Sequence, residues 1–260
     1  MPRTNASILQ KPRVARRKVV RDLTIREEHQ RGMSVIEVAI ILIIIGISAA
    51  GVVQGQQLVA SARTRAVITQ QEKFTLALLA FQDRFRALPG DYQTANISIP
   101  GVVWNGNGNG IIESNATPFN SNGVRPENIL AWDHISKAGF VNERYEFTSP
   151  NLVQAVPTNI YGGFANIEYD TAYGNPVNAN KPSRHSVKSG NLIPVEILWE
   201  MDNKVDDGRA FSGVVQFSNY ATVGPVPTSP GGNAGCTDAN GNWQINAIPR
   251  QLNCGVASFF

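Results

Sequence analysis

Cysteine, histidine and charged side chains are all scarce in this sequence. Its 260 residues include two cysteines and three histidines, and charged residues make up 17% of the chain. Two cysteines are too few for a small disulfide-dense protein, and a hydrophobic content of 42% excludes a disordered or collagen-like chain. The motifs G-x-S-x-G and H-E-x-x-H and the Walker phosphate-binding loop are absent. We therefore predict that the chain is not an enzyme; the enzymatic alternative is a triad assembled from residues far apart in sequence.

The basic residues are unevenly distributed. Residues 1–32 hold nine Lys and Arg against three Asp and Glu, whereas residues 33–260 hold 14 against 17. A nucleic-acid-binding protein normally carries its basic surplus on the folded domain. Here the surplus lies in an N-terminal leader, so we expect no nucleic acid among the partners.

Proline is absent between Pro12 and Pro89, and 13 prolines follow from Pro89 onward. A stretch without proline can form one uninterrupted helix, whereas a chain rich in proline and glycine forms short elements and loops. The sequence thus predicts a long helix over residues 33–88 and a globular head over residues 89–260.

The first part of this helix is almost entirely apolar. Twelve of the 19 residues from Val35 to Val53 are Ile, Leu or Val, and Glu37 is the only charged residue between Met33 and Ala62. This length matches the roughly 20 residues that span a bilayer. A basic leader before such a segment favours a cytoplasmic leader and an exported head. We therefore expect a transmembrane segment over residues 35–53.

The second part of the helix is amphipathic. Its large apolar residues recur at helical spacing and form one stripe, Phe74, Leu78, Phe81, Phe85 and Leu88. The stripe predicts that this part packs against the head on one side.

The junction between leader and helix has a known counterpart. The segment Arg31-Gly32-Met33-Ser34-Val35-Ile36-Glu37, with the apolar run that follows it, resembles the processing site of type IV prepilins and type II secretion pseudopilins. Gly32, Met33 and Glu37 match that family position by position. Most members have phenylalanine where this chain has Met33; this methionine and the leader of 32 residues are more similar to the type IVb branch.

The resemblance implies a processing and assembly pathway. A membrane peptidase, which is also an N-methyltransferase, would cleave after Gly32 and methylate Met33. The mature chain would sit once in the bacterial inner membrane with its head in the periplasm. It would then polymerise with copies of itself into a pilus or pseudopilus, with an assembly platform and an ATPase as further partners.

Elementary electrostatics suggests a role for the glutamate in assembly. The new ammonium at Met33 would pair with Glu37 of a neighbouring subunit and so fix the register between subunits. The alternative is that Glu37 only reaches the cytoplasmic headgroups. Another alternative is an ordinary secretory signal cleaved after Ala50, or a signal anchor, with a ligand-binding head that does not polymerise.

For the head, the resemblance implies an α+β, pilin-like fold in which a small antiparallel sheet packs on the long helix. Short helices are predicted over residues 126–138 and 194–205, and strands over residues 165–169 and 213–217. The segments Leu88–Tyr92 and Trp104–Gly110 also resemble bacterial pilin-like proteins with large heads.

Two kinds of head residues have candidate roles. Cys236 and Cys254 are expected to form a disulfide loop in an oxidising envelope, with metal ligation as the alternative. Calcium is the one possible cofactor, and two oxygen-rich groups could bind it: Asp202, Asp206 and Asp207; and Asn105, Asn107, Asn109, Gly110 and Glu113. The alternatives are a solvated helix end and a glycine-rich turn. His134 and His185 are expected to be surface or hydrogen-bonded residues.

Overall fold

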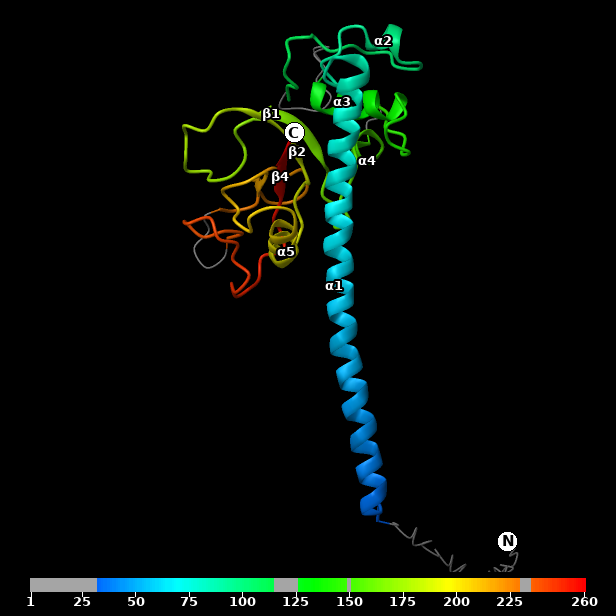
Figure 1. The fold of residues 1–260 in the computed structure, drawn as a ribbon, viewed down its shortest axis with the longest axis vertical. Coiled ribbons are helices and arrows are strands. Elements are labelled where there is room, and N and C mark those ends of the chain that lie inside the picture. The colour runs from blue at the N-terminus through cyan, green and yellow to red at the C-terminus, as the bar shows by residue number, and fades with distance from the viewer. Residues whose placement is uncertain (1–31, 115–125, 149–150, 230–234) are drawn as a thin grey trace, which may run out of the picture. The chain divides into compact units, whose positions relative to one another are not determined.

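A computed structural model describes residues 32–114, 126–148, 151–229 and 235–260 (Figure 1). The predicted leader therefore lies outside the described residues except for Gly32. The helices are α1 (Val35–Phe85), α2 (Ala95–Ser98), α3 (Glu127–Lys137), α4 (Leu152–Ala155) and α5 (Val195–Val205). The strands are β1 (Asn166–Asp170), β2 (Arg184–Lys188), β3 (Val215–Phe217) and β4 (Val256–Phe259). The expected combination of a long N-terminal helix and a small antiparallel sheet is confirmed.

The long helix α1 is 51 residues long and unbroken. It begins at Val35 rather than Met33 and ends at Phe85 rather than Leu88. Arg86 adopts a left-handed backbone conformation with φ 53°, which stops the helix. Pro89 disfavours helical geometry at the residue before it, so the chain does not resume the helix there. From Gly51 onward, α1 belongs to the same compact unit as the head.

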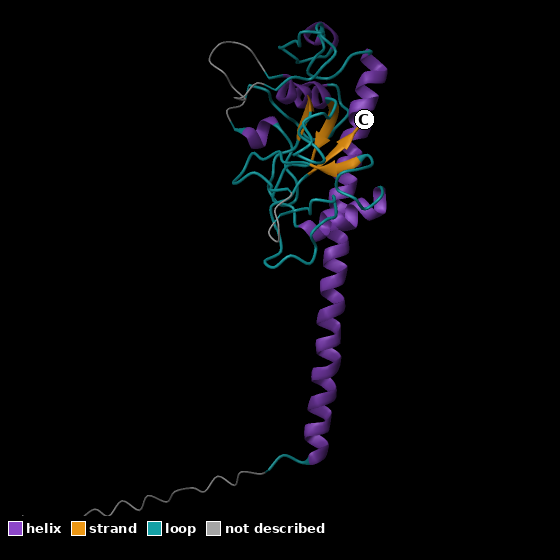
Figure 2. Ribbon diagram, turned by 90° about the vertical axis from the view of Figure 1, so that its left-hand side faces the viewer, coloured by secondary structure: helices purple, strands orange, loops and turns teal. Residues whose placement is uncertain are grey.

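The four strands form one antiparallel sheet in the order β1-β2-β4-β3. Figure 2 shows the strands in orange within the head. Because side chains alternate along a strand, opposite partners share a face. Ile167 lies opposite Val187, and both are buried in the core. The other face carries Asn166 opposite Lys188, and these polar residues are also buried. At this end of the β1–β2 pair, the sheet therefore has one apolar and one polar face, and both are buried.

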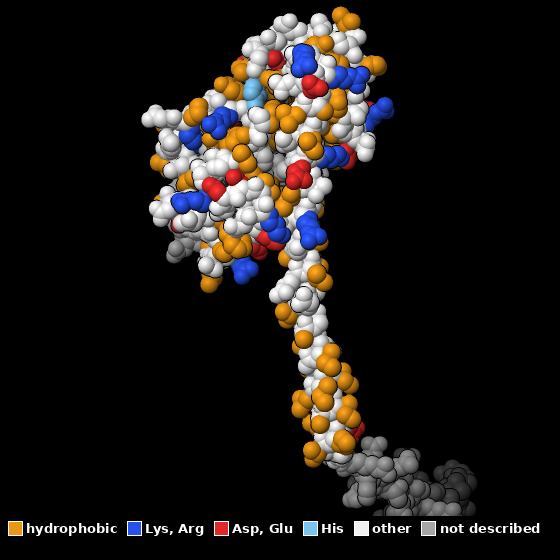
Figure 3. All heavy atoms as spheres, viewed as in Figure 1, with side chains coloured by type: hydrophobic (Ala, Val, Ile, Leu, Met, Phe, Trp, Pro, Cys, Tyr) orange, Lys and Arg blue, Asp and Glu red, His pale blue; other side chains and the backbone are white. Residues whose placement is uncertain are grey.

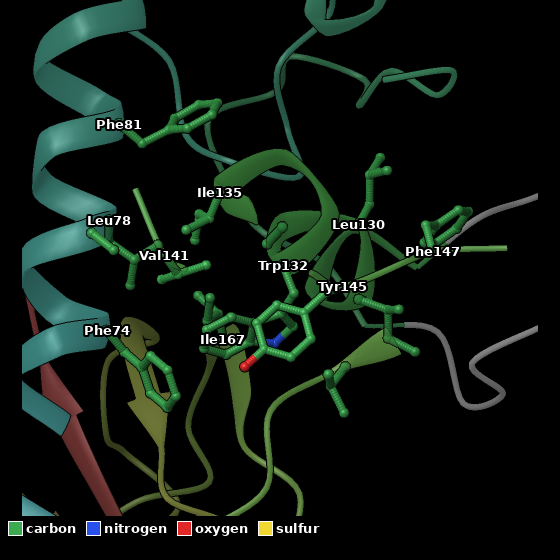
Figure 4. Packing of buried hydrophobic residues seen from close by; sticks show 14 of the residues in the cluster. Phe74, Leu78, Phe81, Leu130, Trp132, Ile135, Val141, Tyr145, Phe147 and Ile167 are labelled. Carbon is green, nitrogen blue, oxygen red and sulfur yellow. The ribbon is translucent and has the colours of Figure 1, made fainter. Parts of the chain in front are cut away.

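The apolar face of the sheet contributes to a core shared by α1 and α3. The predicted stripe supplies Phe74, Leu78 and Phe81, each at most 2% exposed (Figure 4). Phe74 meets Trp132 of α3 edge-to-face, with ring centroids 4.8 Å apart. Fully burying a side chain of this size stabilises a fold by about 1.5–3 kcal/mol. The stripe is thus the part of α1 that holds the head.

A second core lies around α5. Its buried members include Val67 of α1, Leu198 and Met201 of α5, and Phe217 of β3. A hydrogen bond of 2.7 Å from Thr64 Oγ1 to a carboxylate oxygen of α5 reinforces the contact with α1. Helix α5 and the head part of α1 therefore pack against one another.

The predicted short elements are found with small shifts. Helix α3 begins after Pro126, and Gly139 takes the positive φ of 82° that favours glycine at a helix C-terminus. Strand β1 lies one residue later than predicted. Strand β3 begins at Val215 rather than residue 213 because Gly213 has a φ of 77°, outside the strand region. Strands β2 and β4 were not predicted.

Candidate functional site

The predicted processing residues lie at the start of the described chain. Gly32 and Met33 are exposed and precede the helix, whose first residue is Val35. Glu37 lies in the first turn of α1, where a negative charge interacts favourably with the helix dipole. Because α1 begins only at Val35, Met33 is not helical, and helix geometry does not fix the distance between Met33 and Glu37.

The first half of α1 exposes an apolar surface. Its side chains include Ile36, Leu42 and Ile47, which are 63–70% exposed. Figure 3 shows hydrophobic side chains gathered on the visible face of this half. The helix is long and apolar enough to cross a membrane by length and composition. It can therefore serve as a transmembrane segment or as a signal anchor.

Glu37 stands out within this apolar surface. Among the residues that the structure describes, no basic side chain forms an ion pair with its carboxylate. A carboxylate in an apolar environment carries a large desolvation cost unless a cation or hydrogen-bond donors accompany it. Within the described residues of the chain, Glu37 is thus a carboxyl group without an ion-pair partner at the start of an apolar helix.

A second polar site lies in the head beyond the end of α1. The carboxylate of Asp91 accepts hydrogen bonds from three successive backbone N–H groups, those of Gly108, Asn109 and Gly110, at 2.5–3.0 Å. Such a row of N–H donors forms a binding site for an anion. Here the carboxylate of Asp91, a residue of the same chain, occupies that site. The side chain is 5% exposed. Asp91 therefore fixes the glycine–asparagine loop.

The asparagines of this loop were candidate calcium ligands. Asn105 Oδ1 accepts from a backbone N–H, as do Asn107 Oδ1 from Asn109 and Asn109 Oδ1 from Ile111, at 2.8–3.0 Å. The Asn107 amide nitrogen donates to Glu113 at 3.1 Å. The bonds accepted by Asn107 and Asn109, each from the residue two positions later, are those of a turn stabilised by asparagine side chains. They agree with the alternative of a glycine-rich turn, and calcium binding here stays a prediction.

Glu127 holds the same loop from the start of α3. Its two carboxylate oxygens accept from the backbone N–H groups of Asn107 and Glu113 at 2.9 and 3.2 Å. Burial raises the pKa of Glu127 to about 7, and the nearby charge of Asp91 adds to the increase. The two acidic residues thus meet on one loop, a placement that the sequence did not indicate.

The two histidines discussed above are structural. His134 Nδ1 accepts from the backbone N–H of Gly90 at 3.0 Å, so its Nε2 carries the proton that faces the Trp104 carbonyl, also at 3.0 Å. Burial lowers the pKa of His134, which favours this neutral form. His185 accepts from the backbone N–H of Ile112 through Nε2. Both follow the hydrogen-bonded expectation.

The predicted acidic cluster is brought together at the end of α5. Candidate ligand atoms of Asp202, Asp206 and Asp207 lie within 4.8 Å of one another. Asp202 is fully buried, and burial followed by the charges of the other two raises its pKa to about 6. Its Oδ2 accepts from Trp243 Nε1 at 2.7 Å. Asp206 Oδ2 accepts from the backbone N–H groups of Val214, just before β3, and of Val215, the first residue of β3.

The third carboxylate of the cluster is also used within the chain. Asp207 accepts from the Ser212 hydroxyl at 2.6 Å, and this bond lowers the pKa of Asp207. Each acid therefore has a structural role that needs no cation. Calcium binding at these three residues stays a prediction.

Cys236 and Cys254 form a disulfide bond, with their Cα atoms 5.8 Å apart and both residues buried. This separation lies in the usual range for a disulfide. Cys254 also exchanges two backbone hydrogen bonds with Ile193, just before α5. The predicted pairing is confirmed, and it ties the C-terminal loop to the second core.

We compared the chain with known protein families, curated proteins and solved structures. No protein-family model, no curated protein and no solved structure matches this chain.

Proposed function

We propose that this chain is a pilin-like structural subunit of a type IV pilus-like filament or a type II secretion pseudopilus. In this proposal the leader is removed after Gly32, the apolar half of α1 holds the subunit in the inner membrane, and the subunits then polymerise through α1. The head remains outside the membrane and forms the surface of the fibre.

One observation carries the proposal. Directly after Gly32 and Met33, α1 exposes apolar side chains around a single carboxylate, Glu37, which has no cation within the described residues. In a simple anchor, a charged residue at this position gains only its interaction with the helix dipole, and the charge opposes insertion. A polymer contact does gain from it. The charge fixes the register of helices whose apolar surfaces could otherwise slide past one another.

The proposed contact pairs two groups from different subunits. Cleavage after Gly32 creates an ammonium at Met33, and the Glu37 carboxylate of a neighbour neutralises it in a core without water. Removing one partner from a buried ion pair costs about 3–5 kcal/mol, because the other charge stays buried and unpaired. The proposed partners are further copies of the chain, the prepilin peptidase and N-methyltransferase, and the inner-membrane platform with its ATPase.

Assembly of Glu37 variants tests the proposal. We expect Glu37→Ala and the isosteric Glu37→Gln both to insert normally and to lose most of the filament yield. Yield is compared at equal amounts of processed subunit in the membrane. Glu72→Gln, on the head part of α1, is the control and should assemble as the wild type does.

Two outcomes would contradict the proposal. Wild-type yield from both Glu37 variants would remove the pairing role. A wild-type chain that stays monomeric in the membrane, when expressed with the complete assembly machinery, would instead favour a signal-anchored envelope protein whose head binds a ligand.

A further inference from the structure

The polar face of the sheet buries a lysine. Lys188 of β2 is 1% exposed, and its ammonium group contacts Glu168 Oε2 at 3.1 Å and Asp170 Oδ2 of β1. The ammonium also lies 5.4 Å from the ring centroid of Tyr220. Buried lysines are rare and need compensating partners. This one has two carboxylates, which can remove its proton as well as neutralise it.

An amide lies beside the same lysine. Asn166 is directly opposite Lys188 in the β1–β2 register and is 2% exposed. Its Nδ2 donates to Glu168 Oε2 at 2.8 Å, so one carboxylate oxygen contacts both the lysine nitrogen and the amide nitrogen. Its Oδ1 accepts from Asn128 Nδ2 at 3.0 Å. An amine, an amide, a shared carboxylate and a donor on the carbonyl oxygen therefore meet in one buried site.

We propose that Lys188 and Asn166 form an intramolecular isopeptide bond, a covalent cross-link between β2 and β1. Each group needed for the reaction is present among these residues. Lys188 supplies the nucleophile, the side-chain carbonyl carbon of Asn166 is the electrophile, and Glu168 transfers protons between them. The Asn128 amide donates to the oxygen on which negative charge develops.

The reaction balances without any further reactant. The Lys188 ammonium first gives a proton to Asp170, and the neutral amine attacks Cγ of Asn166. Glu168 takes a proton from the attacking nitrogen and gives it to Nδ2, so the C–N bond to Nδ2 breaks and ammonia leaves. Ammonia then takes the proton held by Asp170 and departs as ammonium. One amide replaces another, no atom is oxidised or reduced, and both carboxylates return to their initial state.

Formation of the isopeptide bond removes the positive charge of Lys188, with which Glu168 and Asp170 were paired. Arg184 lies opposite Asp170 in the β1–β2 register, and Lys181 is close enough to Asp170 for their charges to interact. Two cations therefore remain near Asp170 after the bond forms. The Ser114 hydroxyl donates a hydrogen bond to the other carboxylate, that of Glu168.

Mass spectrometry of the full chain tests the proposal. After reduction of the disulfide, we expect the mass of the wild-type protein to be lower than the sequence requires by one ammonia, about 17 Da. Trypsin should fail to cleave after Lys188. The peptide of residues 145–184 should be joined to the peptide of residues 185–204, because Lys181 precedes a proline and is not a cleavage site.

Variants identify the reacting groups. Lys188→Arg keeps the charge but removes the amine, and Glu168→Gln keeps the shape but removes the proton carrier; both should restore the full mass. Lys181→Arg is the control, and its mass deficit should stay that of the wild type. A wild-type protein of full mass, with separate peptides and a free Lys188 amine, would overturn the proposal and leave an ion-paired lysine only. None of these results depends on whether the chain polymerises.

Discussion

Trp243 donates a hydrogen bond of 2.7 Å from its indole nitrogen to the buried carboxylate of Asp202. Trp243 belongs to the loop closed by Cys236 and Cys254, whereas Asp202 belongs to α5. The bond therefore joins the disulfide loop to the helix beneath it. The acceptor, Asp202, also lies beside Asp206 and Asp207. The negative charges of these two residues disfavour a negative charge on Asp202.

The cluster predicts that stability depends on pH. The folded-state pKa of Asp202, about 6, lies above its ordinary value of 3.8. A carboxyl group with a raised pKa favours the folded state only while it is protonated. Its contribution to the free energy of unfolding is therefore lost as the pH rises from about 4 through about 6.

Asp202→Asn tests this dependence because the amide oxygen can still accept from Trp243 and carries no charge. We expect it to raise the free energy of unfolding by about 1–2 kcal/mol near pH 8 and to change it little near pH 4. Thermal unfolding of the detergent-solubilised chain, with a chelator present, measures both. Asp207→Asn is the control and should give no gain near pH 8, since Ser212 stabilises that carboxylate. An unchanged Asp202→Asn profile would contradict the prediction.

Loss of the disulfide should destabilise the head. We expect the double variant Cys236→Ser, Cys254→Ser to lose about 3 kcal/mol of unfolding free energy, because the unfolded chain regains the freedom that the cross-link removed. Denaturant unfolding checks this, and the reduced wild type should behave like the variant. Equal midpoints for the oxidised wild type and the variant would argue against a structural disulfide.

Two adjacent leucines of α1 should respond differently to the same change. Leu78 is 1% exposed and belongs to the core, whereas Leu79 is 45% exposed. We expect Leu78→Ala to cost about 2–5 kcal/mol through lost burial and a cavity, and Leu79→Ala to cost about 0.5 kcal/mol or less. Unfolding of the head, followed by tryptophan fluorescence, measures both. Similar losses would mean that the head does not pack on this side of α1.

Processing gives a prediction at the other end of the helix. We expect the mature chain to begin at Met33 with a methylated amine, and Gly32→Val, which adds a branched side chain before the cleaved bond, to retain its leader. Intact mass of the membrane form measures both. A chain that begins at Gly51 would instead establish cleavage of an ordinary secretory signal.

The sequence predicted the local elements well. The stripe through Phe74, Leu78 and Phe81 is a pattern within one helix, and all three residues are buried as expected. The disulfide was also predictable, because only two cysteines exist. The exact end of α1 was not, since it depends on the left-handed conformation of Arg86, a residue with no strong preference for it.

The missed elements depend on partners far away in the chain. Strand β2, with Arg184, His185 and Lys188 in five residues, resembles an exposed polar segment. Its last three residues are nevertheless buried, and Lys188 can be among them because Glu168 and Asp170 on β1 compensate its charge. Asp91 likewise gave no sign that it would bind a loop of residues 108–110. These placements arise from tertiary contacts that no local pattern contains.

The position of β4 in the sheet means that the sheet can be completed only at the end of synthesis. Strand β4 lies between β2 and β3, yet it begins at Val256, long after β2 ends at Lys188. The ribosome therefore produces α1 and most of the head before the strand that joins the two halves of the sheet exists. Pairings this distant along the chain form slowly. If α1 inserts into a membrane while the chain is still being made, insertion precedes the folding of the head. The unpaired edges of β2 and β3 would then need shielding during export.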